Sequence, residues 1–222
     1  MRPVNVRDRF SYGLLLLLLP VLLNAQSFHL ARLKYGGGGD WYADPSSLPN
    51  LIEFIQEETS IRLGDQEARV ELGDAELFNY PFLYMTGHGN VRFTDAEVRA
   101  LRDYLASGGF LHTDDNYGLD ESFRREMKRV FPSKEWVELP RDHALFQRPF
   151  GFPDGLPKIH EHDGKPPQAL ALFHEGRICV LYTYETDLGD GWEDLEVHND
   201  GPAKHRQALE MGANIVYYAL AN

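Results

Sequence analysis

Apolar segments of strand length alternate with amphipathic segments of helical length along the first half of the chain. The expected strands end at glycine or polar residues and cover residues 28–35, 82–85 and 109–113. Between and after them, apolar side chains recur every three or four residues, which predicts helices beginning near Ser47, Thr94 and Asp120. Ser47 is expected to cap the first helix, and Thr94 with Glu97 has the spacing of a capping box. Alternating strands and helices predict a mostly parallel sheet with helices on both faces.

The second half of the chain has a less regular pattern. Two apolar runs, residues 169–173 and 178–184, are joined by four polar or glycine residues and predict a β-hairpin. Before them, residues 140–167 contain six prolines and are expected to form a long surface loop. Residues 187–194 are expected to form an acidic loop, and the last helix is expected to begin near Pro202.

The N-terminal segment has the three-part pattern of a secretory signal. Three arginines precede an apolar run over residues 13–23, which is too short to span a bilayer comfortably. Cleavage is expected after Ala25, although an uncleaved membrane anchor is the alternative. The sequence therefore predicts a signal peptide over residues 1–25 and one extracytoplasmic domain, periplasmic or secreted, over residues 26–222. No stable membrane insertion is expected after cleavage.

The net negative charge of this domain limits the kinds of partner that it can bind. Without residues 1–25 the chain has 19 basic and 33 acidic residues and a formal charge of −14. Such a balance repels nucleic acid, so no nucleic-acid partner is expected. The single cysteine, Cys179, lies in an apolar segment and is expected to be a small buried side chain. Whether a protein partner exists is left open.

Five segments of the chain carry a resemblance to a known family. They are residues 32–42, 84–89, 109–116, 158–168 and 187–194. These segments resemble the uncharacterised bacterial family called domain of unknown function 4159, which is placed in the class I glutamine amidotransferase-like superfamily. The resemblance covers nearly the whole mature chain and implies a flavodoxin-like or amidotransferase-like α/β fold. It implies no established activity.

The superfamily resemblance also argues against one reaction. Its amidotransferase members place a cysteine nucleophile on a sharp turn after a strand. The most similar turn here holds Thr86-Gly87-His88-Gly89, and Cys179 stands in a different kind of segment. Without a thiolate at that turn, we expect that the protein is not an active glutamine amidotransferase.

Polar clusters follow the predicted strands, where such folds bind ligands. The leading hypothesis is therefore a site for a small polar ligand at the C-terminal edge of the sheet. The candidate ligand-binding residues are Asp40, Trp41, Tyr42, His88, His112, Asp114, Asp115 and Asn116. Aromatic rings next to carboxylates would suit a carbohydrate-like ligand, and the loop with Trp41 and Tyr42 could cover it.

A second hypothesis is a metal-dependent hydrolase. His160 and His162 point the same way if their segment is extended, and with Asp187 and Asp190 they are candidate ligands of a divalent metal. Imidazole with carboxylate would suit zinc, manganese or iron. Asp115 or Glu161 is the candidate catalytic general base.

A third hypothesis treats the polar clusters as loop organisers in a non-catalytic partner of a cell-envelope assembly. The sequence does not decide between the three, and it leaves open whether the protein is an enzyme.

Overall fold

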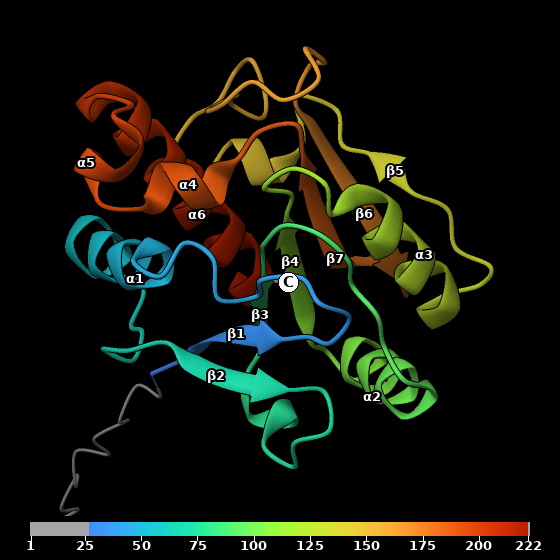
Figure 1. The fold of residues 1–222 in the computed structure, drawn as a ribbon. Helices are drawn as coiled ribbons and strands as arrows, with labels where there is room; N and C mark the ends of the chain where they lie inside the picture. The colour runs from blue at the N-terminus through green and yellow to red at the C-terminus, as the bar shows by residue number, and fades with distance from the viewer. Residues whose placement is uncertain (1–26, 222) are drawn as a thin grey trace, which may run out of the picture.

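Residues 27–221, which the computed structural model describes, form one seven-stranded sheet in the order β2-β1-β3-β4-β7-β6-β5 (Figure 1). The strands are β1 (Leu30–Lys34), β2 (Ala68–Glu71), β3 (Phe82–Met85), β4 (Phe110–Asp114), β5 (Val137–Glu138), β6 (Gln168–His174) and β7 (Arg177–Tyr184). Strands β2, β1, β3, β4 and β7 are parallel, whereas β6 is antiparallel to both β7 and β5. The mostly parallel α/β sheet and the β6–β7 hairpin are thus confirmed.

Helices cover both faces of this sheet. They are α1 (Ser47–Glu58), α2 (Asp95–Ala106), α3 (Asp120–Val130), α4 (Leu188–Trp192), α5 (Leu195–His198) and α6 (Pro202–Ala221). Apolar residues of α1, α4 and α6 share one core cluster with Phe82 and Tyr84 of β3. Those of α2 and α3 share the other cluster with Leu83 and Met85 of the same strand. Alternate residues of β3 thus supply opposite layers, as the pleat of a strand requires.

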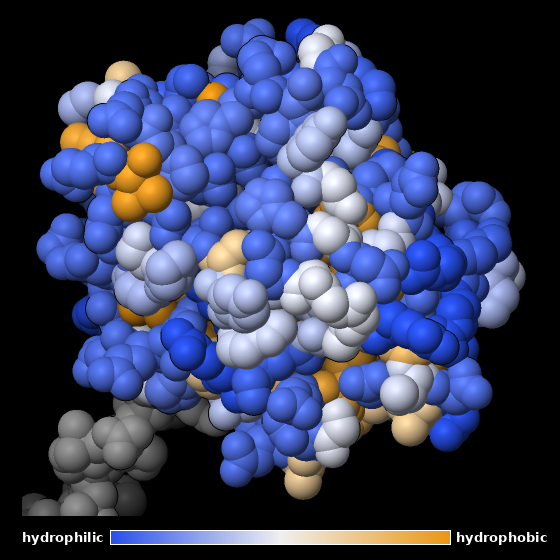
Figure 2. Space-filling view, in the orientation of Figure 1, coloured by the Kyte–Doolittle hydropathy of each residue, from blue (hydrophilic) through white to orange (hydrophobic). Residues whose placement is uncertain are grey.

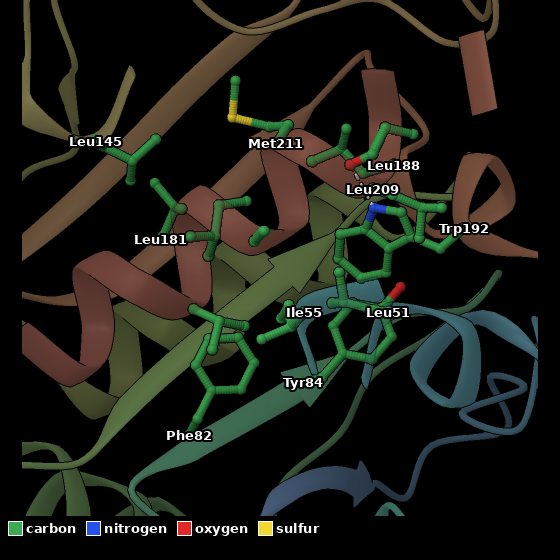
Figure 3. Packing of buried hydrophobic residues seen from close by; sticks show 14 of the residues in the cluster. Leu51, Ile55, Phe82, Tyr84, Leu145, Leu181, Leu188, Trp192, Leu209 and Met211 are labelled. Atoms are coloured by element: carbon green, nitrogen blue, oxygen red, sulfur yellow. Dashed lines mark hydrogen bonds between the residues drawn. The ribbon is translucent and has the colours of Figure 1, made fainter. Parts of the chain in front are cut away.

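Helix α4 packs against the sheet together with α6. Figure 3 shows Tyr84, Trp192 and Leu51 close together in this core, and the two rings are tilted by 46° with their centroids 5.2 Å apart. Trp192 is buried, and its indole N–H donates to the carbonyl of Ala208 at 2.7 Å. Burial of a ring of this size anchors a helix of only five residues, which could not be stable alone.

Helix boundaries follow the sequence signals with one exception. Thr94 and Glu97 form the predicted capping box at the start of α2. Ser47, however, is the first residue of α1 and does not cap it, because its hydroxyl donates to the carbonyl of Asp44 at 2.7 Å. The residue before it, Ser46, holds the capping position without a side-chain cap bond. The cap prediction was therefore wrong by one residue and in its chemistry.

The proline-rich segment 140–167 is more than a surface loop. It contains a 3₁₀ turn, Ala144–Phe146, and it places Leu145, Phe146 and Phe152 in the core. The buried side-chain amide of Asn214 on α6 donates to the carbonyls of Leu145 and Phe150, at 3.0 and 2.8 Å. The expected surface path was wrong because these apolar side chains face α6. Residues 187–194, expected as a loop, mostly form α4.

The described surface is polar on the face shown in Figure 2, where apolar residues form small separate patches. The predicted signal peptide lies outside the described residues. Among the helices within residues 27–221, none combines the length and the apolar character needed to cross a membrane.

Candidate metal centre

The carboxyl ends of the parallel strands lead into four segments that meet. Asp44, in the loop after β1, accepts a hydrogen bond from the hydroxyl of Thr86, after β3, at 3.2 Å. Asn116, after β4, donates from its side-chain amide to both Asp44 and Asp190, and the bond to Asp190 Oδ1 measures 3.1 Å. Asp190 belongs to α4, which follows β7. One edge of the sheet thus gathers side chains that are up to 146 residues apart in sequence.

A histidine and carboxylate network lies beside this junction. His160 Nδ1 is 2.9 Å from Asp187 Oδ2 and 3.3 Å from Asp190 Oδ2, while His160 Nε2 is 2.9 Å from Asp200 Oδ1. His198 Nδ1 is 3.4 Å from the same Asp190 oxygen. Two imidazoles from distant segments therefore converge on one carboxylate oxygen.

The distal nitrogens of the same two imidazoles are also held. His160 Nε2 is 2.9 Å from Asp200 Oδ1, and His198 Nε2 is 3.2 Å from Glu193 Oε2. Each ring is therefore fixed in orientation by a carboxylate on the side that faces away from Asp190. Histidines that bind metals in proteins are typically oriented by such a partner.

His162 and Asp187 extend the network. His162 Nε2 is 3.0 Å from Asp187 Oδ2, so this one oxygen faces both His160 and His162. The other oxygen, Asp187 Oδ1, is buried and has no hydrogen-bond partner among the described residues. An unpaired buried carboxylate oxygen is costly in the absence of a cation or a bound water.

Local backbone geometry aims these side chains. Asp187, Glu185 and Asp44 all adopt the left-handed region, with φ of 64°, 59° and 55°. The amides of Ile159 and His160 donate to the carbonyl of Thr186, at 2.8 and 3.2 Å, which fastens the histidine segment to the end of β7. Non-glycine residues adopt left-handed conformations at a cost, and such residues gather at functional sites.

The charges of the network are strongly perturbed. Hydrogen bonds to Asp187 and Asp190 raise the pKa of His160 to about 10, so the metal-free ring is an imidazolium. Burial tends to raise the pKa of Asp187, but the hydrogen bonds from His160 and His162 outweigh it and lower that pKa. Burial, with the neighbouring Asp190, raises the pKa of Asp44 to about 8. Such shifts cluster at functional sites.

His160, Asp190 and His198 can hold a metal ion together. Among the described residues, one ligand atom from each of the three lies within 4.8 Å of the others, and all three side chains are partly exposed. A tetrahedral zinc ion with bonds of about 2.0 to 2.1 Å separates its ligand atoms by about 3.3 Å. The separations of His160 Nδ1 and His198 Nδ1 from Asp190 Oδ2, 3.3 and 3.4 Å, match that spacing. An ion would displace the proton of His160.

The predicted ligand-binding residues of β4 lie beneath this surface. His112 and Asp114 are fully buried, and each contacts the hydroxyl of Thr183 on β7. Burial lowers the pKa of His112 to about 3 and raises the pKa of Asp114. Asp115 is also buried and accepts from the amide of Leu119 at 3.1 Å. Direct ligand contact by these residues stays a prediction.

The remaining candidates lie at the surface. Asp40 accepts from the backbone amide of His88, and its other oxygen is 3.2 Å from His88 Nδ1. Tyr42 is 64% exposed beside the partly buried Trp41, which leaves the predicted covering loop open to solvent. Glu161, one candidate general base, is exposed and pairs with Lys158 at 3.1 Å.

Sequence reasoning predicted four members of the network and missed three. It singled out His160, His162, Asp187 and Asp190 as metal candidates, and the structure brings these four together. It did not single out His198, Asp200 or Glu193 for this role. A histidine and an aspartate two residues apart, just before the Pro202 helix start, were the available signal.

Comparison with known proteins gives a family and no activity. A search of curated proteins found no match. The family model described as domain of unknown function (DUF4159) matches residues 29–220, which is nearly the whole described chain. The chain therefore belongs to the DUF4159 family.

Proposed function

We propose that this protein is an extracytoplasmic metal-binding domain whose divalent ion is held by His160, Asp190 and His198. One observation carries the proposal. Both imidazoles direct one nitrogen at Asp190 Oδ2 and present the other to a separate carboxylate, Asp200 or Glu193. A histidine bound to a metal on one side and a carboxylate on the other is the usual arrangement in metalloproteins.

The donor set favours zinc. Two imidazole nitrogens and one carboxylate oxygen form a set typical of catalytic zinc sites, with manganese and iron as the next candidates. The buried Asp187 lies against His160 and has an unpaired oxygen, so it supplies negative charge that a cation would offset.

A site with three protein ligands leaves room for a water molecule. Zinc lowers the pKa of such a water to about 7 and so makes it a nucleophile at neutral pH. The ligands are partly exposed, so water and a small molecule can reach them. We propose hydrolysis of a small polar substrate, and the exposed ring of Tyr117, 5.3 Å from the ring of His162, offers a surface for a carbohydrate-like group. The surrounding carboxylates disfavour an anionic substrate.

We also propose the flavodoxin-like, amidotransferase-like class for the fold. The five parallel strands follow the order β2-β1-β3-β4-β7, which corresponds to the flavodoxin order 2-1-3-4-5. Cys179 is buried within β7, and burial raises the pKa of its thiol, which supports the absence of glutaminase chemistry. We also propose a bacterial origin, which the family resemblance implies, and export, which the charged and apolar pattern of residues 1–25 indicates.

The proposal is tested by elemental analysis of residues 26–222 purified without chelator or metal-affinity tag. We expect about one zinc ion per chain, because the three proposed ligands together hold one ion. A His160→Ala, His198→Ala variant should retain its circular dichroism spectrum and lose the metal. A His29→Ala, His205→Ala variant removes two histidines elsewhere and should keep it. Metal-free wild-type protein that also fails to take up added zinc would contradict the proposal.

A further inference from the structure

We infer that Asp114 is the positioning residue of the proposed centre, because it fixes the turn that presents Asp187 and Asp190. The inference rests on the proposed function. Asp114 is fully buried, and its side-chain hydrogen bonds join it to Thr183 and Gly189 rather than to the three proposed ligands. It acts through the backbone of Gly189, which lies between Asp187 and Asp190 in the chain.

The two oxygens of Asp114 join β4, β7 and the start of α4. Asp114 Oδ2 accepts from the amide of Gly189 at 2.7 Å, and Asp114 Oδ1 accepts from the hydroxyl of Thr183 at 2.5 Å. Amides in the first turn of a helix have no partner within the helix. The carboxyl of Asp114 supplies that partner from the centre of the sheet.

Thr183, the hydrogen-bond donor to Asp114 Oδ1, is itself held in place. Thr183 pairs directly with Asp114 in the parallel register of β4 and β7. The hydroxyl of Thr183 is also 2.9 Å from His112 Nε2. His112, Thr183 and Asp114 are at most 1% exposed. These bonds are therefore shielded from bulk water, and the carboxyl that accepts from Gly189 is itself held by the paired strands.

The turn at Gly189 is closely packed against its neighbours. A Cβ atom on Gly189 would lie 2.4 Å from the hydroxyl of Tyr84 and 2.8 Å from Asp44 Oδ2. The turn is thus pressed against the sheet at the point where Asp114 holds it. Asp187 begins the turn in a left-handed conformation, which persists only where the surroundings impose it.

Loss of the acceptor at Asp114 should therefore move the ligand Asp190 and the neighbouring Asp187. Removing groups that orient metal ligands typically weakens metal binding about 10- to 100-fold. Asp114→Ala removes the acceptor of the Gly189 amide. Asp114→Asn keeps it, since the amide oxygen can face Gly189 while the amide nitrogen donates to Thr183.

The test measures zinc affinity by competition with a chromophoric chelator, together with the visible spectrum of the cobalt(II)-loaded protein. We expect Asp114→Ala to bind zinc about 10- to 100-fold more weakly with an altered cobalt spectrum. Asp114→Asn should stay within about threefold of wild type and keep the spectrum, which a role limited to burying a charge would not predict. Glu126→Ala is the matched control, because it removes a buried carboxyl that pairs with Arg129 on the opposite face of the sheet.

If Asp114→Ala does not fold, Thr183→Val serves as the second variant. It removes the hydroxyl that donates to Asp114 and changes the shape of the side chain little. It should weaken zinc binding and alter the cobalt spectrum in the same direction. Folded Asp114→Ala or Thr183→Val protein with wild-type affinity and spectrum would overturn the inference while leaving the metal centre in place. Wild-type protein without metal affinity would overturn the proposed function, and this inference with it.

Discussion

Arg32 is the residue whose replacement tests most sharply how the loop of Asp44 is held. The side chain is 1% exposed on β1, and its guanidinium donates to Glu67 at 3.0 Å and to the carbonyls of Ala43 and Asp44 at 2.9 and 3.1 Å. Arg32→Met would remove the buried donor that these three acceptors share, although the carbonyl of Asp44 keeps the bond from the hydroxyl of Ser47 at 2.7 Å. Breaking a buried ion pair from one side costs about 3 to 5 kcal/mol. Glu67 keeps a second partner in Arg69, so we expect about 3 kcal/mol.

Lys34 is the matched control, two residues along the same strand. Its ammonium pairs with Glu71 at 3.0 Å, but the two side chains are 35% and 58% exposed. An exposed pair contributes about 0 to 1 kcal/mol, so Lys34→Met should be close to neutral. Urea denaturation followed by tryptophan fluorescence gives both free energies of unfolding. At about 2 to 4 °C per kcal/mol, the thermal midpoint of Arg32→Met should fall by about 6 to 12 °C. Equal losses in the two variants would refute the reasoning.

Three further predictions follow from buried groups and from one helix end. The pKa of His112 is about 3 in the folded chain, below the ordinary value of 6.5, so the unfolded chain binds the extra proton and stability falls as pH drops from 6.5 towards 3. Relative to His112→Gln, the free energy of unfolding of the wild-type protein should therefore fall by about 1 kcal/mol between pH 7.5 and 5.5 in urea titrations, and a difference that stays constant with pH would contradict this. Cys179 is fully buried, so a thiol reagent such as dithiobisnitrobenzoate should modify it at least about tenfold faster in urea than in the native protein, and rapid native reaction would show an accessible thiol. Thr94→Ala removes the hydroxyl that accepts from Glu97 in the capping box and should cost about 1 kcal/mol in thermal or urea unfolding, against no measurable change for Ser133→Ala.

Most of the fold could be predicted because its elements carry their own signals. The strand at 82–85 and the capping box at Thr94 are local patterns, and both are present in the structure. Strand β2 (Ala68–Glu71) has only four residues and one buried side chain, Val70, so its alternation of apolar and polar residues is too short to be distinctive. Helix α4 contains two glycines, which indicate a turn, and it exists because Leu188 and Trp192 are buried against the sheet.

The candidate site could be predicted only in part, because alternation along a strand does not reveal depth. His112 and Asp114 follow the pattern of an edge cluster, but pairing with β7 and cover by α4 bury them. Asp187 was detectable as a polar residue after a predicted strand, and His160 as part of the run His160-Glu161-His162. His198 and Asp200 reach the same place from a short helix and the turn after it, and their approach depends on how α5 and α6 pack rather than on a local motif.

Diffraction from a crystal grown with zinc, with data collected on both sides of the zinc absorption edge, tests the central claim most directly. We expect one strong anomalous peak about 2 Å from His160 Nδ1, Asp190 Oδ2 and His198 Nδ1, with bond lengths as in other zinc proteins. Well-ordered density for the three side chains, with their mutual contacts retained and no anomalous peak between them, would contradict the claim and leave a network of ion pairs in its place.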